Sequence, residues 1–352
     1  LVTDLAQSDV RANNDIEIKA EGTITVDVNA GDVISTNGSI ALEAGTNIVQ
    51  NGLVQANTTV SMEAKAGDIT MGEDSRVIAN ADVSLEANGS IITEIISTSG
   101  NVSLVASTGS VSDIDANSKI SANGLNVQAA TNIGSVANVL NTEVSKIAMD
   151  AGSDIYVSEV DSIEVAEVTV SIDTQNTVNS GINSVGTLVL NAADSITTNA
   201  NIVSTNADIN LEAGTYIAQN ALVQANSTVS INAQTGNITM GDNSSTISNA
   251  DISLEAKDSI VTQLISTSAN VSLVATNGSV SDIDENSKVQ ANTLSIQSGA
   301  HIGEANNHFN TQVSTITTVS QDDTFIDEVD AIIISDITSA GSLVLESGAM
   351  SV

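Results

Sequence analysis

Two nearly identical stretches carry the residue types best suited to metal chemistry. The first, "VSDIDANSK", spans residues 111–119, and the second, "VSDIDENSK", spans residues 280–288. Each places carboxylate or amide oxygens at alternate positions, as the start of a calcium loop does. The candidate metal ligands are Asp113, Asp115, Asn117, Asp282, Asp284 and Asn286.

The remainder of each stretch departs from the calcium-loop pattern. A helix–loop–helix calcium loop continues with Gly at position six and Glu at position twelve. Here position six is Ser118 or Ser287, and position twelve is Gly124 or Thr293. The competing interpretation is a turn, in which Asp and Asn side chains bond the backbone two residues on and Ile114 can still point inward. We favour the turn and keep the metal site as the alternative hypothesis.

The composition describes an acidic chain with almost no aromatic residues. Among 352 residues, 43 are Asp or Glu and 8 are Lys or Arg, for a formal net charge of −35. The chain has no Cys, Pro or Trp and only two Tyr and two Phe, although 41% of its residues are apolar. Aromatic side chains dominate thick globular cores, so we expect a long, thin core of aliphatic side chains.

The charge balance excludes some partners and favours others. Binding to nucleic acid needs a positive patch, and no apolar run approaches the 18 or more residues that a membrane span requires. We therefore expect no nucleic-acid partner and no membrane insertion. An acidic surface favours divalent cations, so we expect weak Ca²⁺ binding at that surface and no required cofactor.

The chain contains a long internal repeat. The stretch "LEAGTNIVQNGLVQANTTV" at residues 42–60 returns as "LEAGTYIAQNALVQANSTV" at residues 211–229, an offset of 169. The correspondence runs without a gap from about residue 35 to about residue 147 of the first occurrence. We predict an internal duplication of about residues 33–168 and 202–337, which we call the first copy and the second copy.

A shorter repeat lies within each copy. A phrase of the form apolar-x-apolar-x-small recurs about every 21 residues, as in "IALEA", "VSMEA" and "VSLEA". Its second apolar residue falls at Leu42, Met62, Leu85, Leu104, Val127, Met149, Val170, Leu190 and Leu211. The alternation within each phrase is that of a β-strand. Eight such steps fill one offset of 169.

A unit of about 21 residues cannot bury its own apolar face, but stacked units can. We therefore predict an all-β protein, a right-handed parallel β-helix of about 16 coils. The coils would form two tandem blocks of eight within one continuous solenoid over residues 1–352. The absence of Pro agrees, because every strand of such a stack must donate hydrogen bonds to a neighbour.

The residue after each second apolar position should point outward and stack on its counterpart in the next coil, about 5 Å away. These outward residues are Glu43, Glu63, Glu86, Val105, Gln128 and Asp150 in the first copy, Asn191 between the copies, and Glu212, Asn232, Glu255, Val274 and Gln297 in the second. Like charges at that distance repel each other. Such a column is either a solvated acidic face or a place where divalent cations relieve the repulsion.

The repeat phrases resemble those of a known family. "GSIALEAGTNI", "ADVSLEANGSI", "GNVSLVASTGSV" and "GTLVLNAADSI" are similar to the repeats of filamentous haemagglutinin-like proteins, bacterial exoproteins and adhesins exported by two-partner secretion. The resemblance covers nearly the whole chain from about residue 14 and rests on repeat style. It implies a secreted, right-handed β-helical stalk at the bacterial cell surface. Autotransporter passengers and giant cell-contact proteins carry similar repeats.

The resulting functional hypothesis is a structural and adhesive segment of an extracellular fibre, without enzymatic activity. The expected partners are other copies of the chain, or its own continuation end to end, together with cell-surface receptors or polysaccharide. The alternative is a carbohydrate-binding or carbohydrate-cleaving β-helix, which a groove lined by aromatic residues would support. The chain has only two Arg, whereas lyases built on β-helices usually need Arg or Lys beside acidic calcium ligands.

Overall fold

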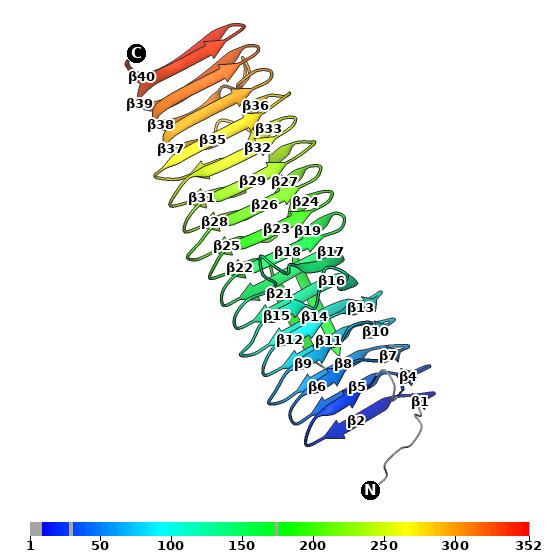
Figure 1. Ribbon diagram of the computed structural model, residues 1–352. Coiled ribbons are helices and arrows are strands. Elements are labelled where there is room, and N and C mark those ends of the chain that lie inside the picture. The colour runs from blue at the N-terminus through cyan, green and yellow to red at the C-terminus, as the bar shows by residue number, and fades with distance from the viewer. Residues whose placement is uncertain (1–8, 28–30, 173–174, 352) are drawn as a thin grey trace. The chain divides into compact units, whose positions relative to one another are not determined.

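The computed structural model describes residues 9–27, 31–172 and 175–351 (Figure 1). These residues form an all-β, right-handed parallel β-helix of about 15 turns of about 22 residues, which confirms the predicted fold class. The chain divides into two compact units: unit 1 comprises residues 1–161 and 166–184, and unit 2 comprises residues 162–165 and 185–352. The prediction of one continuous solenoid includes residues outside the described ranges and stays a prediction.

Three parallel stacks of short strands build unit 1. The first stack contains β2 (Ile16–Ala20), β5 (Ile40–Ala44), β8 (Val60–Ala64), β11 (Val83–Ala87) and β14 (Asn101–Ala106), followed by the second halves of β16 (Lys119–Ala129) and β17 (Leu140–Ala151). The second stack is β3 (Ile24–Val26), β6 (Ile48–Gln50), β9 (Ile69–Met71), β12 (Ile91–Thr93) and β15 (Val111–Asp113), and β18 (Ile155–Glu159) follows later in the chain. The third stack is β1 (Val10–Ala12), β4 (Val33–Ser35), β7 (Leu53–Ala56), β10 (Arg76–Ala79) and β13 (Ile95–Thr98), followed by the first halves of β16 and β17.

Unit 2 repeats this arrangement. Its first stack is β23 (Leu188–Ala192), β26 (Ile209–Ala213), β29 (Val229–Ala233), β32 (Ile252–Ala256) and β35 (Asn270–Ala275). Its second is β19 (Ile163–Val165), β24 (Ile196–Thr198), β27 (Ile217–Gln219), β30 (Ile238–Met240), β33 (Ile260–Thr262) and β36 (Val280–Asp282). Its third is β25 (Ile202–Ser204), β28 (Leu222–Ala225), β31 (Ser245–Ser248) and β34 (Leu264–Ser266). Four long strands end the unit: β37 (Lys288–Ser298), β38 (Phe309–Ser320), β39 (Thr324–Ser339) and β40 (Leu343–Ser351).

The core is a set of aliphatic columns that run from coil to coil. Strand pairing places Leu85 beside Met62 on one side and Leu104 on the other, and all three side chains are at least 99% buried. Each inward position of a strand therefore contacts the same position of the next coil, about 4.8 Å away. Phe309 is also fully buried and is the bulkiest of the fully buried side chains. The predicted thin aliphatic core is confirmed.

Polar side chains at the turns tie one coil to the next. An Asp or Asn side-chain oxygen accepts the backbone N–H of a residue about one coil further along, so that this N–H is not left without a partner. Such bonds join Asp15 to Ser39, Asn47 to Asp68, Asp68 to Ser90 and Asp82 to Asn101 in unit 1, and Asp208 to Thr228, Asn237 to Ser259, Asp251 to Asn270 and Asp323 to Ser342 in unit 2. Many acidic residues of the chain thus serve as coil-to-coil hydrogen-bond acceptors.

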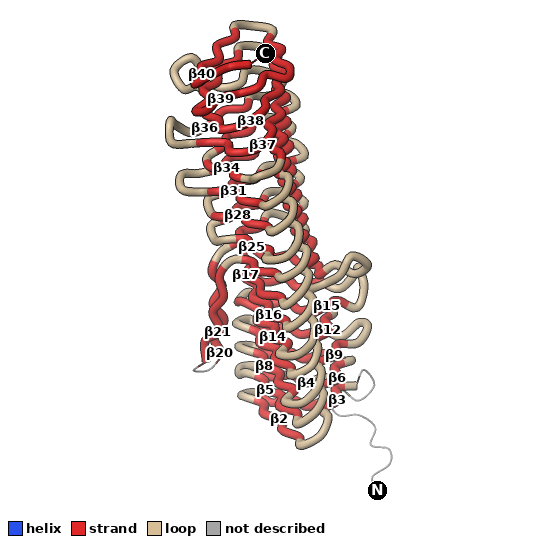
Figure 2. The backbone as a smooth tube through the Cα atoms, turned by 90° about the vertical axis from the view of Figure 1, so that its left-hand side faces the viewer, coloured by secondary structure: helices blue, strands red, loops and turns tan. Residues whose placement is uncertain are grey.

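An antiparallel hairpin interrupts the coils of unit 1 and corrects the predicted coil count. Strands β20 (Glu167–Ile172) and β21 (Gln175–Ser180) pair with each other over six residue pairs, and β22 (Ile182–Ser184) returns to the coil. Figure 2 shows the hairpin beside the stacked strands of unit 1. Val170 lies in this hairpin, so the prediction of two short coils between Met149 and Leu190 was wrong. The chain makes about 15 turns rather than about 16.

At two equivalent positions, one in each copy, the backbone conformation requires glycine. Gly134 and Gly303 both have φ +64°, a left-handed conformation that side chains disfavour. A Cβ atom on Gly134 would lie 2.3 Å from the carbonyl oxygen of Tyr156, and one on Gly303 would lie 2.2 Å from that of Phe325. Neither contact can be relieved without moving the backbone of the next coil.

We expect Gly134→Ala and Gly303→Ala each to lower the free energy of unfolding by about 1–3 kcal/mol or more, because the substituted residue is strained and its Cβ meets backbone. Urea unfolding followed by circular dichroism measures the change. The matched control is Gly22→Ala, where nothing lies within 4 Å of the added Cβ. Equal effects at all three positions would contradict this account of the two turns.

Candidate functional site at the duplicated aspartate corners

The two aspartate motifs lie at corresponding corners, and the first Asp of each is the last residue of its strand, β15 in the first copy and β36 in the second. Alternation along each strand turns its last residue inward: Asp113 is 3% exposed and Asp282 is 6% exposed. Ile114, which we expected could still point inward, is half-buried. The strand register, which continues through the first Asp, places the carboxylate and not the isoleucine inside.

The carboxylate of Asp113 is bonded by groups from two other coils. Its Oδ1 accepts a hydrogen bond from Thr93 Oγ1 at 2.7 Å, and its Oδ2 accepts bonds from the backbone N–H and the side-chain Nδ2 of Asn141 at 2.7 and 3.0 Å. Burial raises the pKa of Asp113 to about 6, although the bonds from Asn141 and Thr93 act in the opposite direction. The nearby charge of Glu94 adds to the rise.

The second copy repeats this arrangement with two differences, in the donor to Oδ1 and in the acidic neighbour. Asp282 Oδ2 accepts bonds from the backbone N–H and the side-chain Nδ2 of Asn310, both at 2.8 Å, and Oδ1 accepts one from Asn307 Nδ2 at 2.9 Å. Burial again raises the pKa of this carboxyl. The residue that corresponds to Glu94 is Gln263, so the second copy lacks the buried carboxylate neighbour of the first.

The second aspartate of each motif faces solvent and forms the predicted turn. Asp115 Oδ1 accepts the backbone N–H of Asn117 at 2.8 Å and that of Ser118 at 3.3 Å. Asp284 does the same for the backbone N–H of Asn286 at 2.9 Å, and these bonds lower its pKa. Such side-chain-to-backbone bonds are typical of turns that begin with Asp.

The structure therefore separates the candidate metal ligands instead of bringing them together. In each motif the first Asp is turned into the core and bonded there, whereas the second Asp and the Asn lie on the exposed turn. Within residues 9–27, 31–172 and 175–351, no group of three or more His, Cys, Asp or Glu side chains could hold a metal ion. Specific calcium binding at these corners stays a prediction.

A buried glutamate that the sequence analysis missed lies near each corner. Glu159, 2% exposed, accepts bonds at Oε2 from Thr142 Oγ1 at 2.7 Å and from the backbone N–H of Val144 at 3.1 Å. Its Oε1 accepts the backbone N–H of Val160 at 2.9 Å. Burial raises its pKa to about 7, and a side-chain hydrogen bond with Asp161 contributes to the rise.

The second copy holds Glu328, 5% exposed, in the same way. Thr311 Oγ1 and the backbone N–H of Val313 donate to its Oε2 at 2.8 and 3.0 Å, and the backbone N–H of Asp330 donates to its Oε1 at 2.9 Å. The signal for both glutamates was present in the sequence. Each continues an inward alternation, as Ile155, Val157 and Glu159 do, and each recurs at the offset of 169.

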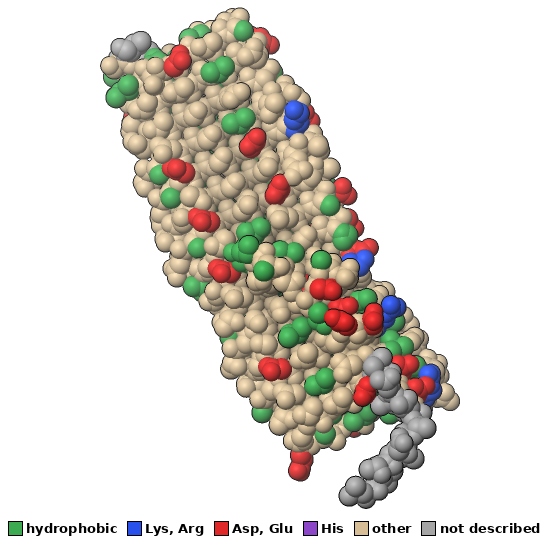
Figure 3. All heavy atoms as spheres, in the orientation of Figure 1, with side chains coloured by type: hydrophobic (Ala, Val, Ile, Leu, Met, Phe, Trp, Pro, Cys, Tyr) green, Lys and Arg blue, Asp and Glu red, His purple; other side chains and the backbone are tan. Residues whose placement is uncertain are grey.

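The predicted outward column is confirmed by the strand register. Glu43 pairs with Glu63, Glu63 with Glu86, and Glu86 with Val105. In the second copy Glu212 pairs with Asn232. The columns thus mix charged with uncharged residues. Figure 3 shows Asp and Glu side chains mostly scattered among uncharged polar surface on one face.

Lysines neutralise one end of this column. Lys19 pairs in register with Glu43 and forms an ion pair with it at 3.1 Å, and Lys65 forms another with the same carboxylate. Hydrogen bonds from Lys65 and Lys19 lower the pKa of Glu43. The repulsion expected along the column is therefore relieved at this position by Lys side chains.

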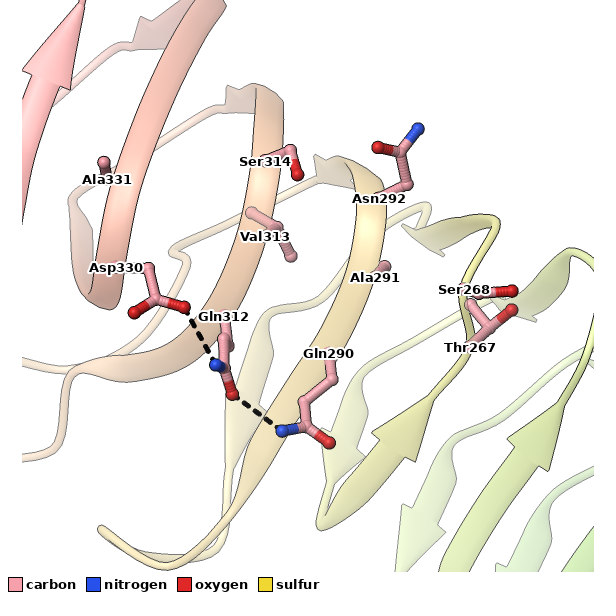
Figure 4. A pocket seen from close by; sticks show the side chains of 10 residues that line it. All are labelled: Thr267, Ser268, Gln290, Ala291, Asn292, Gln312, Val313, Ser314, Asp330 and Ala331. Carbon is pink, nitrogen blue, oxygen red and sulfur yellow. Dashed lines mark hydrogen bonds between the residues drawn. The ribbon is translucent and has the colours of Figure 1, made fainter.

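A polar groove of about 780 Å³ lies in unit 2, where β37, β38 and β39 bend (Figure 4). A chain of hydrogen bonds crosses it: Gln290 Nε2 donates to Gln312 Oε1 at 2.7 Å, and Gln312 Nε2 donates to Asp330 Oδ2 at 2.8 Å. Ala, Val, Ser, Thr and Asn complete its lining, with no aromatic side chain among the ten residues. The groove therefore lacks the aromatic lining that would have supported the carbohydrate-binding alternative.

Comparison with known proteins gave no relative. No family model, curated protein or solved structure matches the chain. The class that the fold itself defines is the parallel β-solenoid with tandem repeats. No helix long and apolar enough to cross a membrane occurs in the part of the chain that the structure describes.

The buried carboxyls should make the protein less stable as the pH rises. Glu159 has a folded-state pKa of about 7 against an ordinary value of 4.5, and Asp113 has about 6 against 3.8. When the pKa of a carboxyl is higher in the folded state, the protonated group stabilises the fold. This stabilisation is complete at a pH below the unfolded-state pKa, and it is lost as the pH rises through the folded-state pKa. Each group should lower the free energy of unfolding by up to about 1.4 kcal/mol per pH unit within that window.

Urea unfolding between pH 4 and pH 8 tests this expectation. The Glu159→Gln variant should show a flatter decline between pH 4.5 and pH 7 than the unsubstituted chain. At pH 4, where Glu159 is mostly protonated in both states, the two proteins should be similar in stability, which controls for damage by the substitution. Identical pH profiles would show that Glu159 does not titrate with a raised pKa.

Proposed function

We propose that this chain is a structural and adhesive segment of a secreted bacterial surface fibre, of the filamentous haemagglutinin type. The observation that carries the proposal is that both the inward and the turn side chains form contacts between successive coils. Inward residues pack against the next coil, and turn residues such as Asp82 accept the backbone N–H of the next coil. A protein whose residues serve coil-to-coil contacts is suited to transmit load along its coils.

The repeat phrases give the second line of support, because they resemble those of secreted adhesins. The surface agrees with this role. It is acidic, and the exposed second aspartate of each corner, Asp115 or Asp284, is bonded within its own turn. We propose an extracellular location, no enzymatic activity, and partners that are other copies of the chain, its continuation, or cell-surface receptors and polysaccharide. Weak Ca²⁺ binding at stacked carboxylates such as Glu63 and Glu86 would bridge acidic copies.

Bead aggregation tests both the adhesive role and the calcium bridging. Beads coated with the chain should bind one another or bind bacterial cells more than beads coated with serum albumin, and millimolar Ca²⁺ should increase the binding reversibly. The matched variant is Glu63→Gln with Glu86→Gln, which neutralises two stacked carboxylates without disturbing the core. We expect this variant to lose most of the calcium effect.

The possible outcomes separate the parts of the proposal. Binding that persists unchanged in EDTA would rule out calcium bridging but leave adhesion in place. Beads that bind neither one another nor cells would contradict the adhesive role, and the chain would then act as a spacer alone.

A further inference from the structure

The hairpin β20–β21 leaves the coil and rejoins it at a closed neck. The backbone N–H of Ala166 donates to the carbonyl of Ile147 at 3.2 Å, and that of Met149 donates to the carbonyl of Gly181 at 2.9 Å. Across the neck, the backbone N–H of Gly181 lies 3.4 Å from the carbonyl oxygen of Ala166. The coil therefore continues from Ala166 to Gly181 with its own hydrogen bonds. These bonds do not depend on where the hairpin lies.

Among the described residues, the docked hairpin is held by side-chain packing and by two hydrogen bonds at one edge, without strand pairing to the coil. On its inner side, Val168 and Val170 pack against Ala148, which is fully buried although it points out of the coil. At one edge, Asn101 Nδ2 donates to the carbonyl of Thr169 at 2.8 Å, and the backbone N–H of Ser171 donates to the free carboxylate oxygen of Asp82 at 2.6 Å. The two strands form a sheet of their own, and the pairings of the described residues join neither to another strand.

Polar side chains buried beside this contact have no partner. Ser103 and Asn126 are neighbours on β14 and β16, both point out of the coil, and both are fully buried. The hydroxyl of Ser103 and both polar atoms of the Asn126 amide lack a hydrogen bond, as does Nδ2 of Asn179 on the hairpin. An unpaired buried polar group opposes the burial that creates it.

The second copy shows the same face without a hairpin. Ser272 and Ser295, which correspond to Ser103 and Asn126, are half-buried and exposed. There the amide of Asn270, the counterpart of Asn101, bonds Asp251 of the adjacent coil instead of a hairpin backbone. The strands of the second copy nevertheless keep their pairing, so the face does not need a cover to form.

We propose that β20–β21 is a detachable arm, which undocks from the outer face of β14, β16 and β17 while the coil beneath stays closed. Undocking hydrates Ser103 and Asn126 and breaks only the contacts of the arm. The arm thereby controls access to the strip of outer face that contains Ser103, Asn126 and Ala148. This inference does not depend on the proposed adhesive function.

Thiol labelling tests the arm directly, because the chain contains no Cys. Three single-Cys variants report on three environments. Ser103→Cys lies under the arm, Val102→Cys lies on the same strand but in the core, and Ser272→Cys lies on the matching open face. Reaction with a thiol reagent should be fastest at Ser272→Cys, at least tenfold slower at Ser103→Cys, and slower again by at least tenfold at Val102→Cys.

Two further variants make the result decisive. Asn126→Leu removes two of the unpaired polar atoms and should slow the labelling of Ser103→Cys about tenfold, without changing Ser272→Cys. Deleting residues 167–180 should leave the thermal unfolding of the chain nearly unchanged and should make Ser103→Cys as reactive as Ser272→Cys. Equal rates at Ser103→Cys and Val102→Cys, no slowing by Asn126→Leu, or loss of folding on deletion would each overturn the detachable arm.

Discussion

The structure depends on the register with which each coil pairs to the next. Parallel hydrogen bonding at a spacing of about 4.8 Å places like positions on top of one another, so Leu85 contacts Met62 and Leu104. Because the same inward position must suit its neighbours on both sides, aliphatic side chains of similar size fill the columns. The narrow core that results explains why an apolar content of 41% accompanies only two Tyr and two Phe.

The same register decides the chemistry of the acidic residues. Outward carboxylates such as Glu63 and Glu86 stack at the surface, whereas Asp113 and Glu159 are carried inside by strand alternation and are bonded by other coils. A motif that resembles the start of a calcium loop thus forms a turn whose two carboxylates lie in different environments. One is an interior hydrogen-bond acceptor with a raised pKa, and the other shapes an exposed turn.

Much of the fold could be predicted from the sequence, because the same strand pattern recurs in every coil. A pattern recognised in one coil therefore predicts the structure of the others. Alternation in "NVSLVAS" predicted strand β14 and its inner face, and the offset of 169 predicted the second set of coils. The hairpin could not be predicted in this way, because "EVTVSI" alternates as the coil strands do. Its docking depends on contacts such as that of Asn101 with Thr169, 68 residues apart. Strand alternation alone predicts that Asp113 and Glu159 point inward. We did not predict it, because charged residues generally lie on the surface.

Disulfide cross-linking of stacked positions tests the register most directly. Glu86 and Val105 are register partners on adjacent coils, and parallel partners lie within the Cα separation that a disulfide allows. The Glu86→Cys/Val105→Cys variant should therefore form an intramolecular disulfide readily under mild oxidation. The Glu86→Cys/Ser103→Cys variant, displaced by two residues, should not. Efficient cross-linking of the displaced pair, or none of the aligned pair, would contradict the stacked coils on which the whole account rests.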